Sequence, residues 1–240
     1  MKPILLVRND AFETFGIAPA TFAEAGVPVR VLEAIDPEAP RISLDDVSGV
    51  VVFGSSSNVE HANEQPFIKE LRELTLEALD RDLPYLGVCF GAQVLAWSLD
   101  CPVMKAPVRE VGFEPLRIEP AAGHDPVLSH YRDGDMVFQW HMDTFELPDQ
   151  AHLLATGDGV RNQAYRLGER TWGVQFHFEI DGPEIELWLK EFALLGDLLE
   201  EWGKTSDQVW EETRRHLTAH EAKGREVFRR FADVAREAAR

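Results

Sequence analysis

The sequence has only two cysteines, Cys89 and Cys101, among its 240 residues. Two cysteines cannot build the disulfide framework that stabilises small secreted domains. Long apolar runs are also missing, since no stretch approaches the roughly 20 residues of a transmembrane helix. The chain runs from Met1 straight into a strand-like segment rather than a signal peptide. The sequence therefore predicts a cytoplasmic protein with free thiols and no membrane partner.

Positive charge is scarce, because 24 Lys and Arg stand against 42 Asp and Glu, a formal net charge of −18. Such a surface repels phosphate backbones and anionic lipids, so we expect no nucleic-acid partner. The glycine patterns of dinucleotide-binding and phosphate-binding loops are absent as well. We expect no metal either, because six histidines lack a partner at metal-ligand spacing, those at positions 61, 124, 130, 152, 216 and 220.

What the sequence does contain is an alternation of short apolar runs with helical segments. Residues 67–80 place their apolar side chains on one face of a helix, with charged residues between them. Four runs are typical of buried strands, at 4–7, 29–32, 50–53 and 85–88. This order predicts an α/β fold with a doubly wound, mostly parallel sheet of the flavodoxin-like type.

After residue 103 the pattern changes to strand-like segments separated by glycine-containing turns. We expect these segments to form a small antiparallel or mixed region beside the main sheet, and they span 113–118, 136–140, 152–155 and 163–167. The chain becomes helical beyond residue 182. The sequence therefore predicts an α/β domain over residues 1–182 and a helical extension over 183–240 that packs on the same domain.

One cysteine lies in a context that predicts chemistry. Cys89 is bracketed by Gly87 and Gly91, between a strand-like segment at 83–86 and an apolar helical segment at 92–97. The glycines permit the tight strand-to-helix turn of a nucleophile elbow, and a helix N-terminus favours the thiolate over the thiol. The alternative interpretation is a buried, inert cysteine beside an ordinary turn.

A histidine and a glutamate two residues apart follow another apolar run, at 173–176. Residues i and i+2 of an extended chain point the same way, so His177 and Glu179 should project together from the end of this strand. The imidazole can accept the thiol proton, and the carboxylate can hold the imidazole's tautomer and orientation. With Cys89, these two residues predict a Cys-His-Glu catalytic triad.

In these motifs the chain resembles the class I glutamine amidotransferase family, whose hallmarks are a Gly-x-Cys-x-Gly elbow and a later His-Pro-Glu. The resemblance covers roughly residues 45–180. Within the family, the chain is similar to the glutaminase domain of GMP synthetase. It implies that Cys89 is the nucleophile, that His177 is the general base and acid, and that Glu179 orients His177. Phe178 replaces the family's proline, and we expect Phe178→Pro to be tolerated because proline holds an extended φ.

The same resemblance implies an oxyanion hole made by the backbone N–H groups of Gly54 and Phe90. Each such donor contributes a factor of roughly 10²–10³ to the rate. The family has Gly-Gly-Pro at the first of these positions, and this chain has Phe53-Gly54-Ser55.

Substrate-binding residues are implied by two further segments. Gln93 lies one helical turn after Cys89 and would contact the bound glutamine, although without the motif a solvent-facing role is an equal alternative. The segment 110–112 could help to gate the site. Three residues of a loop would lie near the substrate's α-amino and α-carboxylate groups, or else form an exposed turn, and they are His141, Met142 and Asp143.

The resemblance thus implies a cofactor-free hydrolysis of a γ-glutamyl amide, glutamine to glutamate plus ammonia, through a γ-glutamyl thioester. The small-molecule substrate is glutamine or a γ-glutamyl compound, and a separate synthetase subunit is a possible acceptor of the ammonia. Two alternatives stay open. One is a γ-glutamyl peptidase that has no ammonia acceptor, and the other is a non-catalytic regulatory module that keeps the fold.

Overall fold

The computed structural model describes residues 1–40, 42–194 and 202–239, and it is built around an eight-stranded sheet. Five neighbouring strands are parallel, in the order β2 (Val29–Glu33), β1 (Ile4–Arg8), β3 (Gly49–Val52), β4 (Tyr85–Val88) and β10 (Thr171–Val174). Three antiparallel strands continue the sheet beyond β10, namely β9 (Asn162–Leu167), β8 (His152–Thr156) and β6 (Arg117–Ile118). The predicted α/β, mostly parallel architecture is confirmed.

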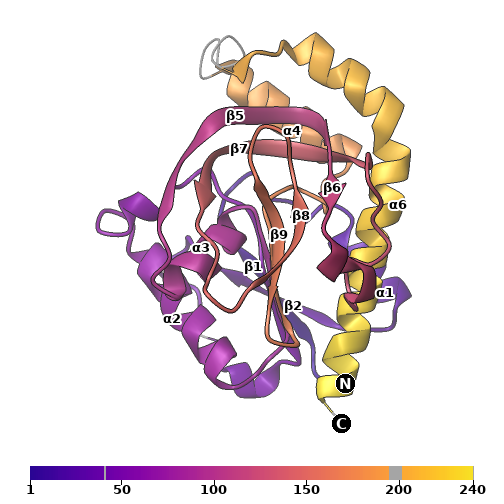
Figure 1. Cartoon of the computed structure of the whole chain (residues 1–240). Helices are drawn as coiled ribbons and strands as arrows, with labels where there is room; N and C mark the ends of the chain where they lie inside the picture. The colour runs from indigo at the N-terminus through magenta and orange to yellow at the C-terminus, as the bar shows by residue number, and fades with distance from the viewer. Residues whose placement is uncertain (41, 195–201, 240) are drawn as a thin grey trace.

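Helices cover both faces of the parallel strands (Figure 1). On one face lie α2 (Pro66–Asp80) and α3 (Phe90–Ser98), and on the other lie α1 (Ala18–Glu24) and the long α6 (Ser206–Ala238). Short 3₁₀ turns occur at Leu44–Asp46, Val59–His61 and Pro120–His124.

Strand β1 shows why the core has two halves. Successive side chains of a strand point to opposite faces, so Ile4 and Leu6 pack into the apolar cluster beneath α1 and α6. Leu5 and Val7 pack into the cluster beneath α2 and α3. All four side chains are fully buried, as expected for a parallel strand that is covered on both faces.

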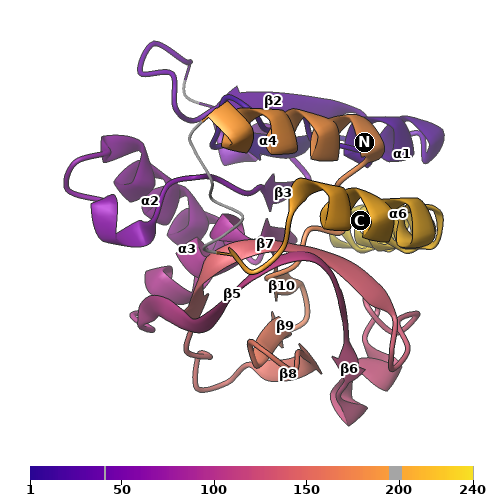
Figure 2. The same cartoon turned by 90° about the horizontal axis from the view of Figure 1, so that it is seen from above.

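The antiparallel region that the sequence predicts is present, in two parts. Strands β6, β8 and β9 extend the main sheet, whereas β5 (Val103–Pro115) and β7 (Met136–Phe145) form a separate two-stranded sheet. Figure 2 shows this pair curving around β8, β9 and β10. A hydrogen bond from the His177 N–H to the Phe138 carbonyl, 2.9 Å long, ties β7 to the segment that follows β10.

The C-terminal part of the chain contains α4 (Gly182–Leu194) and α6, and residues 195–201 lie outside the described part. Helix α6 begins with a capping box between Thr205 and Gln208. Its side chains Phe228 and Phe231 are fully buried in the same apolar cluster as β1. The helical segment therefore packs on the α/β core, while the domain boundary at residue 182 stays a prediction. Within the described residues, no helix combines the length and the apolar character that crossing a bilayer requires.

Candidate active site

Cys89 lies on the turn between β4 and α3, as the first residue before the helix. Its backbone has φ of 50° and ψ of −105°, a conformation that is uncommon for a residue with a side chain. The flanking glycines are needed for packing. A Cβ on Gly91 would lie 2.1 Å from the carbonyl oxygen of Val52, and a Cβ on Gly87 would lie 2.5 Å from that of Gly91. The local structure is therefore a strained strand-to-helix turn that holds the thiol at the carboxyl edge of the sheet.

The thiol itself is nearly enclosed, with Cys89 5% exposed. The side-chain amide of Gln175 donates to its Sγ at 3.4 Å, and the Trp140 carbonyl lies 3.9 Å from the same atom. Gln175 is fully buried and was not singled out from the sequence. The feature of the sequence that could have indicated Gln175 is its polar side chain within the otherwise apolar run 173–176.

His177 and Glu179 lie beside this turn. Strand β10 ends at Val174, two residues earlier than expected, and the Gln175 N–H still donates to the Gln163 carbonyl of β9. His177 Nδ1 and Glu179 Oε1 are 2.6 Å apart, and both side chains are buried.

The protonation of this pair follows from its surroundings. Burial alone lowers the pKa of His177, but the charges of Glu179 and Cys89 and its hydrogen bonds to both outweigh burial, so the pKa lies well above its ordinary value. The imidazolium form of His177 is therefore favoured between the thiol and the carboxylate.

Phe178 has a packing role. Its ring is fully buried, with its centroid 5.1 Å from that of Phe228 and 6.3 Å from that of Phe176. Proline would remove this ring and leave a cavity, and truncations of buried phenylalanines cost about 3–5 kcal/mol. The expectation that Phe178→Pro is tolerated does not agree with this packing.

The backbone around residues 177–179 is held by close contacts instead of by proline. A Cβ on Gly224 of α6 would lie 1.9 Å from the Phe178 carbonyl oxygen, and a Cβ on Gly16 would lie 2.0 Å from that of Glu179. In addition, His220 Nε2 lies 2.8 Å from the His177 carbonyl oxygen. Two glycines and one histidine from distant parts of the chain thus fix the segment that carries His177.

The two candidate oxyanion donors, Gly54 and Phe90, both lie close to Cys89, since Gly54 lines the same hollow and Phe90 follows it in the chain. Phe90 is the first residue of α3, and the N–H groups of a first helical turn have no partner within the helix. Gly54 follows β3, and a Cβ there would lie 2.9 Å from His177 Cε1, so only glycine leaves room for the imidazole. The loop after Gly54 is fixed by Asp10, which accepts hydrogen bonds from the Ser56 N–H at 2.8 Å and the Ser56 hydroxyl at 2.6 Å.

The structure brings Gln93 and Asp143 together. The Gln93 amide lies 3.4 Å from the Asp143 carbonyl oxygen, and the Asp143 carboxylate contacts Asn58 and, at 3.0 Å, Lys105. Met142 is half-buried beside them.

His141 faces into the protein. Its Nδ1 lies 3.1 Å from the Asp143 carbonyl oxygen, and its Nε2 lies 3.0 Å from Glu110 and 3.1 Å from Gln139. Both ring nitrogens are therefore used by the protein. Glu110 also accepts from the Val160 N–H, so it connects the segment 110–112 to this network.

Two hollows meet at Cys89. One, of about 260 Å³, contains Gln93, Met142 and Asp143. The other, of about 80 Å³, contains Glu13 and His177. Both hollows are lined by Cys89, Trp140, Ser55 and Ser56, so the thiol stands at their junction.

Two further buried carboxyl groups, Glu13 and Glu184, lie near the His177–Glu179 pair, and neither was found from the sequence. Glu13 and Glu184 each accept one backbone N–H at 2.6 Å, from Phe15 and Thr14 respectively. Burial, reinforced by the charges of Glu184 and Glu179, raises the pKa of Glu13 well above its ordinary value. Burial and the charge of Glu179 raise the pKa of Glu184 to about 7. For Glu13 the sequence held one indication. It follows β1 closely, and the parallel strands end at the edge of the sheet where the candidate site lies.

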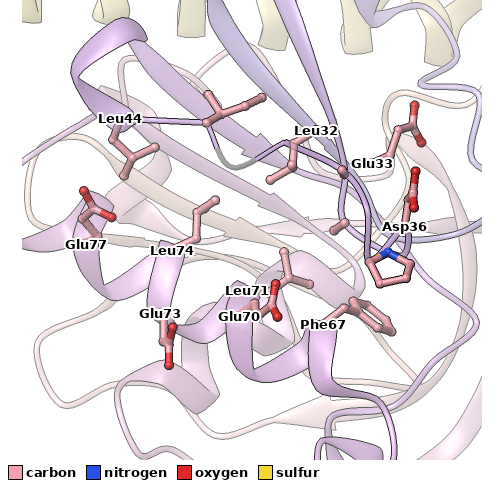
Figure 3. A pocket seen from close by; sticks show the side chains of 14 residues that line it. Leu32, Glu33, Asp36, Leu44, Phe67, Glu70, Leu71, Glu73, Leu74 and Glu77 are labelled. Atoms are coloured by element: carbon pink, nitrogen blue, oxygen red, sulfur yellow. The ribbon is translucent and has the colours of Figure 1, made fainter.

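A third hollow, of about 270 Å³, lies away from the thiol, between β2 and α2 (Figure 3). Apolar side chains such as Leu71 and Leu74 line it together with the carboxylates of Glu70, Glu73 and Glu77. It contains none of the three candidate triad residues and is separate from the site. Within the described part of the chain, no group of three or more His, Cys, Asp or Glu side chains is arranged to hold a metal ion.

Fold and site together define an α/β protein with a cysteine at a strand-to-helix elbow and a buried His-Glu pair beside it. The comparisons with known proteins agree, because residues 18–193 match the family described as Glutamine amidotransferase class-I. The chain belongs to the class I glutamine amidotransferase family.

Individual relatives support this assignment. The glutamine amidotransferase-like protein YfeJ of Salmonella typhimurium is 26% identical over 75% of this chain and 77% of its own length. A GMP synthase (glutamine-hydrolyzing) of Porphyromonas gingivalis is 34% identical over 68% of this chain, but the alignment spans only 30% of that enzyme. The crystal structure of a glutamine amidotransferase from Thermotoga maritima superposes with a TM-score of 0.86 at 26% identity, covering 96% of this chain and 97% of that one.

Proposed function

We propose that this chain hydrolyses a γ-glutamyl amide by covalent catalysis at Cys89. The observation that carries the proposal is the arrangement of one thiol and one buried ion pair. Cys89 stands on a strained elbow at a helix N-terminus, and His177 is held 2.6 Å from Glu179 beside it. Family membership supports the same chemistry.

In the proposed reaction the Cys89 thiolate attacks the side-chain carbonyl carbon of the substrate. The N–H groups of Gly54 and Phe90 stabilise the oxyanion, and His177 gives its proton to the leaving amine as the C–N bond breaks. The product is a γ-glutamyl thioester, which a water molecule activated by His177 then hydrolyses to glutamate. The raised pKa of His177 supports this role, because the ring must hold a proton when the amine leaves.

The glutamyl part of the substrate would occupy the hollow that contains Gln93, Met142 and Asp143. The carboxylate of Asp143 suits an α-ammonium group, and Lys105 beside it suits an α-carboxylate. His141 would act by holding this loop in place, since its ring nitrogens already contact Glu110 and Asp143.

The alignment with GMP synthases favours a second arrangement, in which the ammonia passes to a separate synthetase subunit. Co-purification of this chain with a nucleotide-binding synthetase from a cytoplasmic extract would support that arrangement, and it would also test the predicted cytoplasmic location. Hydrolysis by the purified chain alone, with no stimulation by a partner, would favour the simple hydrolase.

The experiment that tests the function measures glutamate release from glutamine and from γ-glutamyl amides by the purified chain. Cys89→Ser should abolish release and keep the fold, because a hydroxyl is far less acidic than a thiol. Cys101→Ser is the matched control, since Cys101 lies beyond α3 and lines neither hollow at the site. Substantial activity in Cys89→Ser would contradict the covalent mechanism. No turnover in the unmodified chain, together with no labelling of Cys89 by a glutamine-derived electrophile, would favour a non-catalytic module.

A further inference from the structure

The smaller hollow at Cys89 lies where the leaving group must go, an inference that rests on the proposed function. A general acid has to stand beside the nitrogen that it protonates. His177 lines the smaller hollow and not the larger one, whereas Gln93 and Asp143 line only the larger one. With the glutamyl group in the larger hollow, the amine therefore departs into the smaller one, which we call the amine pocket.

The walls of the amine pocket are aromatic. Phe12, Trp140 and Trp188 line it, and the ring centroid of Trp188 lies 4.9 Å from that of His177 and 5.8 Å from that of Trp140. The Trp188 indole N–H donates to the Phe12 carbonyl at 3.0 Å, which joins α4 to the loop after β1. Phe12 is 42% exposed, so the pocket opens to solvent beside it. Aromatic side chains of this kind suit contact with an apolar leaving group better than with ammonia.

The ionisable side chains of the amine pocket, apart from His177, are acidic. Asp10 lines it, with its carboxylate held by the N–H groups of Phe12 at 2.9 Å and Ser56 at 2.8 Å. Glu13 contributes a buried carboxyl group whose Oε2 has no partner among the described residues. None of the described residues that line the pocket is Lys or Arg. A leaving group that carried its own carboxylate would meet Asp10 with no cation except His177, which is needed for proton transfer.

We propose that the substrates are γ-glutamyl amides of apolar primary amines without a carboxylate, such as arylalkylamines, whose ring would contact the aromatic walls and extend toward the open side at Phe12. In the reaction the Cys89 sulfur bonds to the γ-carbonyl carbon, the C–N bond breaks, and the amine leaves with the proton from His177. Water then cleaves the thioester, so the products are glutamate and the free amine. The released amine becomes an ammonium ion, which the Asp10 carboxylate accommodates.

The test compares kcat/KM for three substrates with the same glutamyl group: glutamine, the γ-glutamyl amide of 2-phenylethylamine, and γ-glutamylphenylalanine. The second and third differ only by the carboxylate. We expect the phenylethylamide to exceed each of the other two by about tenfold or more, because an apolar group filling a pocket contributes on the order of 10–200-fold.

Variants at Phe12 locate the effect. Phe12→Ala should reduce the preference for the phenylethylamide over glutamine several-fold, measured as the ratio of the two kcat/KM values. Phe12→Arg supplies the cation that the pocket lacks and should raise kcat/KM for γ-glutamylphenylalanine about tenfold. Leu76→Arg is the matched control, because Leu76 is 41% exposed on α2 and lines neither hollow at Cys89.

The outcomes separate this inference from the proposed function. If glutamine is hydrolysed with an equal or higher kcat/KM than the phenylethylamide, the amine pocket has been misassigned and the proposed function stands. If γ-glutamylphenylalanine is the best substrate of the unmodified chain, the charge argument is wrong. If none of the three is hydrolysed, both the proposed function and this inference are overturned.

Discussion

At the scale of single residues, the proposed proton transfer depends on two buried side chains, His177 and Glu179. His177 Nδ1 and Glu179 Oε1 are 2.6 Å apart and both side chains are buried, which strengthens the electrostatic interaction between them. Glu179 and Cys89 both raise the pKa of His177, and this gives each partner a separable role. In the proposed mechanism the carboxylate of Glu179 orients the His177 ring, and the ring stabilises the Cys89 thiolate.

We therefore expect different effects from removing the two partners. Glu179→Gln should slow glutamate release but leave Cys89 reactive toward a small alkylating agent near neutral pH. His177→Ala should lose both turnover and this reactivity, because the imidazolium is the charge beside the thiolate. The measurement is the rate of Cys89 alkylation as a function of pH. If both variants lost reactivity to the same extent, the three groups would have to be treated as one coupled unit.

The buried carboxyl groups give a prediction about stability. The pKa of Glu184 is about 7, above its ordinary value of 4.5, so the folded chain holds a proton that the unfolded chain releases. The free energy of unfolding should therefore fall as the pH rises from about 4.5 to about 7. Glu184→Gln keeps an acceptor for the Thr14 N–H and should raise that free energy by about 2 kcal/mol at pH 8.

Denaturant unfolding at both pH values checks this. The two chains should be equally stable near pH 4, where Glu184 is protonated whether the chain is folded or not. A stabilising effect that was the same at pH 4 and pH 8 would show that packing, and not the charge of Glu184, is responsible.

At the scale of elements, the elbow depends on the closeness of β3, β4 and α3. A Cβ on Gly91 would lie 2.1 Å from a backbone oxygen of β3, which no side-chain movement can relieve. Gly91→Ala should therefore lower the free energy of unfolding by about 3 kcal/mol or more, or prevent folding. Gly123→Ala is the control, since a Cβ there meets nothing within 4 Å, and it should change stability by less than about 0.5 kcal/mol. Equal effects in a thermal melt would contradict the packing account of the elbow.

The elements also show what the sequence could predict. Regular features, such as the apolar runs of the parallel strands and the glycines around Cys89, led to the fold and to the position of the thiol. Contacts between segments that are distant in the chain leave no recognisable pattern in the sequence, so they could not be predicted. The partner of the thiol, Gln175, and the carboxyl groups of Glu13 and Glu184 reach the site only through tertiary packing. The packing of Phe178 could not be predicted for the same reason, because its partner Phe228 belongs to α6, 50 residues later.

At the scale of the whole molecule, α6 belongs to the structural unit that carries the site. Phe228 and Phe231 share a cluster with β1, and His220 contacts the backbone of His177. Burial raises the cost of charging His220 and lowers its pKa to about 4, so the ring is neutral at pH 7 and its Nε2–H can donate to the His177 carbonyl. Helix and sheet should therefore unfold together.

Hydrogen exchange measures this directly. Backbone amides in the part of α6 that carries Phe228 and Phe231 should exchange with the same free energy as those of β1, because they open only on global unfolding. Exchange from this part of α6 at a much lower free energy, with β1 still protected, would show that residues 183–240 behave as a separate appendage.

The central claim is that Cys89 becomes acylated by the γ-glutamyl group of its substrate. Rapid acid quenching of the chain during turnover, followed by mass spectrometry of the intact protein and its peptides, tests this most directly. The account predicts that the mass rises by one glutamyl group on the peptide that contains Cys89, that the adduct disappears when substrate is exhausted, and that Cys89→Ser shows none. In Glu179→Gln, slower deacylation should let the adduct accumulate, so turnover of this variant without an adduct would contradict the account. An adduct on Cys101 in place of Cys89 would contradict it as well.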